Sequence, residues 1–126
     1  MTKQVTVRWH GELDFDATDK GGAIVPMSSK DDVFGPGLLM LAALGGCTGM
    51  DAVSVMRKKK VDFDSYRVEV SAEQRETYPM AYTSMVVEHI VHGRTISDKA
   101  VSRAIELSAR KYCKVGATIA TGDCSI

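Results

Sequence analysis

The chain lacks a net charge and lacks an uncharged run long enough to cross a membrane as a helix. Its 126 residues carry 16 basic and 16 acidic side chains. Such a balance gives no general attraction to nucleic acid or to an anionic membrane surface. The longest uncharged apolar run, residues 38–50, is closed by Asp51 well short of the roughly 20 residues that a span needs. We therefore expect neither nucleic acid nor a membrane as a partner.

Cysteines are few and odd in number: Cys47, Cys113 and Cys124. The N-terminal stretch MTKQVTVRWHG alternates polar and apolar residues, a pattern unlike that of an export signal. The two observations together argue against a disulfide scaffold. They predict a reducing, cytoplasmic location in which the thiols are free or redox-active.

The composition is typical of one globular domain, residues 1–126, because 44% of the residues are apolar and 25% are charged. Alternating apolar positions predict strands at residues 4–9, 12–17, 23–27, 64–76 and 81–93. Pro36 favours the start of a long helix over residues 38–60, and Ser97 is a candidate N-cap of a second one. The segment KVGATIATGDCSI predicts a closing strand. The order indicates an α+β fold in which antiparallel hairpins pack against helices.

The first predicted helix is apolar around nearly its whole circumference between residues 38 and 50. A helix of this kind has to be covered on all sides. One chain of 126 residues with a few strands and one other helix has too little surface to do so. The pattern therefore predicts a homodimer that encloses this helix.

Cys47 lies in the middle of this helix, and packing and chemistry both remain open for it. A free cysteine in an apolar run is usually a small core residue. Against this, Gly45 and Gly46 each weaken a helix by roughly 1 kcal/mol relative to alanine, which suggests that something approaches closely. Asp51, one turn further on, also places a carboxylate near the thiol, an unusual choice for packing alone.

The other two cysteines, Cys113 and Cys124, are expected in different surroundings. Cys113 falls on the flank of the second helix's apolar face, where Lys111 and Lys114 would favour a thiolate if their charges reach it. An incidental boundary cysteine is an equally good interpretation. Cys124, third from the end of the sequence, is expected to be an exposed thiol.

Signals for metals, cofactors or phosphates are weak. His89 and His92 form an HIVH pair, but a spacing of three in a strand points the rings to opposite faces. No glycine-rich phosphate loop follows a strand. The cations of MRKKK suit the C-terminal end of a helix. We expect no metal and no cofactor.

Two motifs together, LGGCTGMDAVSVMRKKK and LSARKYCKVGATI, resemble the OsmC/Ohr family of osmotically induced and organic hydroperoxide resistance proteins. The resemblance covers essentially the whole chain. It implies an intertwined homodimer in which sheets wrap around long central helices, and a thiol peroxidase that acts in oxidative stress defence. In this reading Cys47 attacks an organic hydroperoxide, Cys113 closes a disulfide with it, and an external dithiol reduces both.

The chain departs from the family's typical site at two places. Leu38 and Gly37 stand where a glutamate is expected, and the hairpin region DATDKGGAIVP has no arginine. An alternative function follows from these departures: a catalytically weak or inactive dimer that binds an apolar small molecule in its interface pocket. The methionines around Cys47, namely Met40, Met50 and Met56, also favour that alternative.

Overall fold

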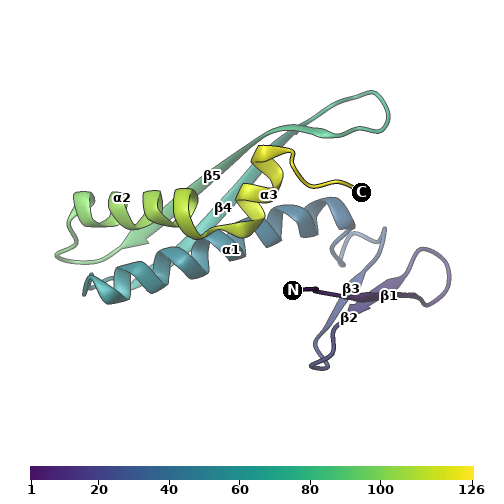
Figure 1. Ribbon diagram of the computed structural model, residues 1–126, viewed down its shortest axis with the longest axis horizontal. Coiled ribbons are helices and arrows are strands. Elements are labelled where there is room, and N and C mark those ends of the chain that lie inside the picture. The colour runs from purple at the N-terminus through teal and green to yellow at the C-terminus, as the bar shows by residue number, and fades with distance from the viewer. The chain divides into compact units, whose positions relative to one another are not determined.

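The computed structural model describes residues 1–126, and its contacts divide the chain into two compact units, Met1–Met40 and Leu41–Ile126. The first unit holds a three-stranded antiparallel sheet of β1 (Thr6–Trp9), β2 (Phe15–Thr18) and β3 (Ile24–Met27), in that order (Figure 1). All three predicted strands are present, with somewhat different ends. This sheet leaves large apolar side chains in solvent, among them Trp9 at 66% and Ile24 at 65% exposure.

Helix α1 runs from Pro36 to Lys58, two residues earlier at each end than predicted. Proline at the first helical position has the required backbone angle and lacks an N–H that would have no partner there. Arg57 and Lys58 lie in the last turn, where cations are favoured. By length and composition α1 could cross a membrane, but the core helix of a water-soluble fold meets the same test.

Strands β4 (Ser65–Gln74) and β5 (Tyr82–His92) form a long antiparallel hairpin, as predicted (Figure 1). Their register pairs Val68 with His89 and Val70 with Val87. The alternation of exposed and half-buried residues along β4 matches its sequence pattern. One face of the hairpin is therefore apolar and available for packing against a helix.

Helix α2 (Asp98–Leu107) begins after Ser97, whose hydroxyl accepts the N–H of Ala100 at 3.3 Å. This confirms the predicted N-cap. Regular α-helix ends at Leu107, and a π-helical turn, η1 (Ser108–Tyr112), follows it. Cys113 is extended, with φ −73° and ψ 97°, so its placement on the flank of the second helix is wrong.

The predicted closing strand is also wrong, because Lys114–Thr121 form helix α3. Cys113 caps this helix: its Sγ accepts the N–H of Gly116 at 3.3 Å. Gly122 ends it with a left-handed φ of 69°. The β-branched residues of the segment favoured a strand, whereas the cap at one end and the glycine at the other decide for a helix.

The core of the second unit lies along one face of α1. Its buried residues recur with each helical turn and include two adjacent pairs: Leu41, Leu44, Gly45, Thr48, Gly49, Ala52 and Met56. A Cβ at Gly45 would lie 3.0 Å from Val70 Cγ2, and one at Gly49 would lie 3.4 Å from Val68 Cγ2. The two glycines thus let β4 approach the helix closely.

The opposite face of α1 is uncovered in the single chain. Ala43 and Gly46 are exposed, and Met50 is 77% exposed. Gly46 has no neighbour within 4 Å of a Cβ built on it, so the expected close approach is present at Gly45 and absent at Gly46. One chain therefore covers only part of this helix, as its composition predicts.

Candidate functional site

The two cysteines singled out from the sequence lie together in the second unit. Cys47 is half-buried on α1, and Cys113 is 4% exposed in the extended residue between η1 and α3. Both are free thiols, and Cys47 is one of the groups that raise the pKa of the Cys113 thiol, so the two side chains are neighbours. Two neighbouring free thiols can form a disulfide where their Cα atoms lie within about 7 Å or can move to that distance. Cys124 is exposed, as predicted, and stands apart from this pair.

The environment of Cys113 favours the protonated thiol. Burial raises its pKa most, and the neighbouring Cys47 and the charge of Asp51 raise it further. The N–H of Gly116 acts in the opposite direction, because it donates to the sulfur. The expectation that Lys111 and Lys114 would favour a thiolate is wrong, since both are exposed and burial decides the direction.

Asp51 is the carboxylate of this site. It lies one turn beyond Cys47 on α1, so both side chains leave the same side of the helix. Successive residues turn by 100°, which puts both at the border between the buried and the uncovered face. The Oδ2 atom of Asp51 is buried and has no hydrogen-bond partner within the chain. A buried acceptor of this kind is costly and is characteristic of functional positions.

A buried polar contact fixes η1 against α1 beside the thiols. The hydroxyls of Thr48 and Ser108 lie 2.9 Å apart, and Ser108 Oγ donates to the carbonyl of Thr48 at 2.7 Å. Thr48 follows Cys47 directly, so this contact holds the helix segment that carries the thiol. The sequence did not single out Ser108 as a site residue. Its position one turn after Ala104, on the buried side of the helix, was the signal that could have found it.

An aromatic pair lies under the same part of α1. The Tyr66 hydroxyl is 2.7 Å from His89 Nδ1, and a Cβ on Gly49 would lie 3.6 Å from that hydroxyl. Burial raises the pKa of Tyr66 to about 12 and lowers that of His89, so both stay neutral near pH 7. His92, on the same strand, is exposed, whereas His89 is half-buried. The two histidines of the HIVH motif therefore lie in different environments, as the strand spacing predicts.

A groove opens next to Cys113, with a volume of about 390 Å³. Its walls come from the start of β5, from α3 and from α1, and they are largely apolar: Leu44, Tyr82, Thr83, Ser84, Met85, Val87, Gly116, Ile119 and Ala120. Gly116 joins this groove to the thiol, since a Cβ there would meet Cys113 Sγ at 3.3 Å. A small apolar molecule could lie there within reach of the site.

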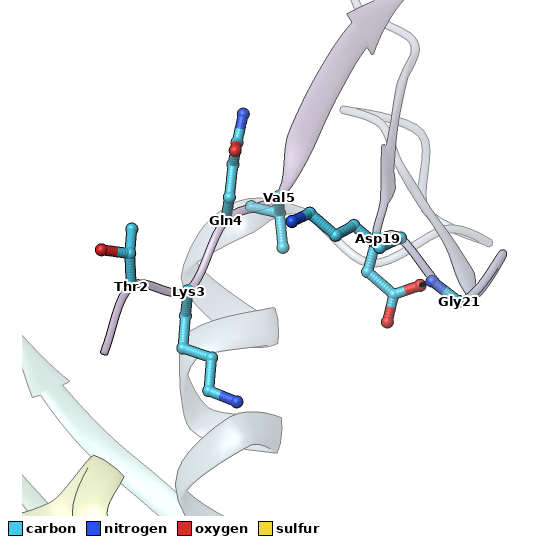
Figure 2. Close-up of a pocket in the computed structure, with 7 residues that line it drawn as sticks. Thr2, Lys3, Gln4, Val5, Asp19 and Gly21 are labelled. Atoms are coloured by element: carbon cyan, nitrogen blue, oxygen red, sulfur yellow. Dashed lines mark hydrogen bonds between the residues drawn. The ribbon is translucent and has the colours of Figure 1, made fainter.

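Another cavity, about 640 Å³, belongs to the first unit and has neither thiol in its lining. Figure 2 shows its lining, in which the side chains of Lys3 and Gln4 point in opposite directions. Asp19 uses its Oδ1 atom for the N–H groups of Gly21 and Ala23 in its own turn. The polar groups do not converge on one point, so this cavity is a weaker candidate than the thiol site.

The methionines around Cys47 do not form one surface. Met56 is fully buried, whereas Met40 and Met50 are 44% and 77% exposed. The chain has no cluster of three or more histidine, cysteine or carboxylate side chains that could hold a metal ion.

Comparison with known proteins places the chain in a family. A family model described as OsmC-like protein matches residues 29–126. Protein YhfA of Escherichia coli K12 is 37% identical over 114 residues, which are 89% of this chain and 85% of YhfA.

Solved structures show the same fold. A hypothetical protein from Aquifex aeolicus VF5 superposes with a TM-score of 0.85 at 25% identity, over 94% of this chain and 87% of that chain. An organic hydroperoxide resistance protein from Elizabethkingia anophelis has a TM-score of 0.64 at 13% identity, over 96% and 91% of the two chains. The family resemblance read from the two cysteine motifs is thus confirmed, and the chain belongs to the OsmC-like protein family.

Proposed function

We propose that the protein is a thiol peroxidase that reduces organic hydroperoxides through Cys47 and Cys113. The observation that carries this proposal is that Cys47, on α1, and Cys113, after η1, are neighbours of unequal exposure. Cys47 is half-buried and the more accessible of the two, and Cys113 is 4% exposed. A more accessible first thiol and a buried second one suit a peroxidatic and a resolving cysteine. Family relatives named as organic hydroperoxide resistance proteins add support.

The reaction has three steps. The Cys47 thiolate attacks the outer oxygen of ROOH, the O–O bond breaks, and the alkoxide leaves as ROH with a proton, which makes a sulfenic acid. Cys113 then attacks the Cys47 sulfur and expels the hydroxyl as water, so a Cys47–Cys113 disulfide forms. An external dithiol reduces this disulfide through a mixed disulfide and restores both thiols. No metal or cofactor takes part in any step.

The reactive assembly in this proposal is a cytoplasmic homodimer. A second copy would cover the uncovered face of α1, where Ala43, Gly46 and Met50 are exposed. The exposed apolar residues of the β1–β3 sheet provide further surface for such an interface. Because Cys47 lies at the border of the uncovered face, the second copy would also shield the reacting sulfur from water.

An alternative function is the binding of an apolar small molecule without chemistry. The apolar groove next to Gly116 is the observation that favours it. The two functions differ in one measurable respect: a binding protein keeps its thiols reduced in the presence of peroxide, whereas a peroxidase oxidises them.

The decisive experiment treats reduced protein with one equivalent of cumene hydroperoxide and identifies the modified thiols by mass spectrometry. We expect a Cys47–Cys113 disulfide that a dithiol reverses. Cys113→Ser should stop at a Cys47 sulfenic acid that dimedone traps, and Cys47→Ser should not react. Cys124→Ser is the matched control and should behave as the wild type. Cys47 that stays reduced under excess peroxide would refute the peroxidase and favour the binding protein.

Assembly is tested separately by light scattering after size exclusion. We expect a dimer at micromolar concentration and dissociation in Met50→Glu, which places a charge on the uncovered face. Ser102→Glu adds the same charge at an exposed polar position of α2 and should leave the dimer intact. A folded wild-type monomer at this concentration would contradict the proposed assembly.

A further inference from the structure

We propose that Asp51 is the proton acceptor for Cys113 when the two thiols close to a disulfide. This inference rests on the proposed function, because it concerns the second step of the same reaction.

The first observation is the state of Cys113. Burial, Cys47 and Asp51 all raise the pKa of this thiol, so it carries its proton at neutral pH. Only a thiolate attacks sulfur at a useful rate. Disulfide closure therefore needs a base that takes the proton as the sulfur attacks.

The second observation is the position of Asp51. It is on the same side of α1 as Cys47, and its charge acts on Cys113, so the carboxylate is near both sulfurs. Its Oδ2 atom is buried and has no donor within the chain, so that oxygen is free to accept a proton. No other group meets both conditions: Lys111 and Lys114 are exposed cations, and His89 Nδ1 is engaged with the Tyr66 hydroxyl.

The proton balance of the step follows directly. Cys113–SH transfers its proton to the Asp51 carboxylate as its sulfur bonds to the Cys47 sulfur. The S–O bond of the sulfenic acid breaks, and the leaving hydroxide takes the proton back from Asp51 as water. The carboxylate is regenerated, and the sum is a thiol and a sulfenic acid giving a disulfide and water.

A peroxide-free reaction tests the role of Asp51 apart from peroxidase activity. In Cys124→Ser protein, an aromatic disulfide such as 5,5′-dithiobis(2-nitrobenzoate) first forms a mixed disulfide at Cys47 and releases one coloured thiolate. Cys113 then loses its proton and attacks the Cys47 sulfur of the mixed disulfide. This step forms the Cys47–Cys113 disulfide and releases the second coloured thiolate. Stopped-flow absorbance measures this second phase between pH 6 and pH 8.

At pH 7 we expect the second phase of Asp51→Asn to be about a hundredfold or more slower than that of wild type, because general-base catalysis typically contributes at least that factor. Its rate should rise about tenfold per pH unit, because the thiolate must now form before attack, whereas the wild-type rate stays nearly flat. Asp51→Glu should restore the flat profile. Asp62→Asn, an exposed position beyond α1, should match wild type.

Three outcomes would overturn the proposal. If Asp51 acts only through its charge, Asp51→Asn lowers the pKa of Cys113 and closes the disulfide faster than wild type. If Asp51 is only structural, both variants slow the reaction but keep the wild-type pH profile. If Asp51 has no role in closing the disulfide, wild type, Asp51→Asn and Asp51→Glu show the same second-phase rate. Failure of the proposed function looks different, since the aromatic disulfide would still close the pair while peroxide would leave it reduced.

Discussion

Ser108 Oγ lies 2.7 Å from the main-chain carbonyl oxygen of Thr48 and 2.9 Å from its hydroxyl, in the interior of the second unit. Ser108 is fully buried, and Thr48 is 4% exposed. This polar contact joins α1 to the π-helical turn that precedes Cys113. It therefore sets the spacing of the segments that carry the two thiols.

Replacing Ser108 by alanine should lower the free energy of unfolding by about 1–3 kcal/mol, because buried polar groups of Thr48 lose their partner. Urea unfolding followed by circular dichroism measures the change. Ser102→Ala removes an exposed hydroxyl from α2 and should stay within about 0.5 kcal/mol of wild type. A Ser108→Ala protein as stable as wild type would show that this contact contributes no net stability.

Gly45→Ala should destabilise the protein even though alanine is the better helix former. The added Cβ would lie 3.0 Å from Val70 Cγ2, so β4 would have to move. Val70→Ala removes the obstructing methyl groups, and the two substitutions together should cost less than the sum of their separate effects, by about 0.5 kcal/mol or more. Gly46→Ala, which has no neighbour within 4 Å, should show no such coupling to Val70→Ala.

Stability should fall as the pH drops below about 6.5, the ordinary pKa of histidine. Burial lowers the pKa of His89 in the folded protein, so below that value the unfolded chain binds a proton that the folded chain does not. The loss should level off once the pH passes the folded pKa of His89. Urea unfolding between pH 7.5 and 5 tests this, and the fall should be smaller in His89→Gln.

His92→Gln provides the control for this pH dependence, since His92 is exposed on the same strand. NMR titration should also give His89 a pKa below the ordinary value of histidine, because burial lowers it. If both variants keep the full pH dependence of the wild type, its cause lies elsewhere than in His89.

The cap of α3 predicts which substitution of Cys113 is suitable for kinetic work. Its sulfur accepts the N–H of Gly116, and a serine hydroxyl can do the same. Cys113→Ala should therefore be less stable than Cys113→Ser by about 0.5–2 kcal/mol, measured by thermal or urea unfolding. Equal stability of the two variants would mean that the sulfur does not act as a helix cap.

Local signals in the sequence determined much of this protein. Pro36 and a long apolar run defined α1 to within two residues, alternation defined the β4–β5 hairpin, and Ser97 marked the start of α2. These features depend on interactions among residues close together in the chain, which composition and spacing record. The two cysteine motifs likewise identified the family and singled out both thiols.

Only the tertiary structure decided how those thiols meet. The proximity of Cys47 to Cys113, the raised pKa of Cys113 and the lack of a hydrogen-bond partner for Asp51 Oδ2 all depend on how distant segments pack together. The helical state of α3 also depends on Cys113, whose sulfur caps it. A sequence records which groups are present, but burial and long-range contact fix their protonation and partners, and these arise only when the chain folds.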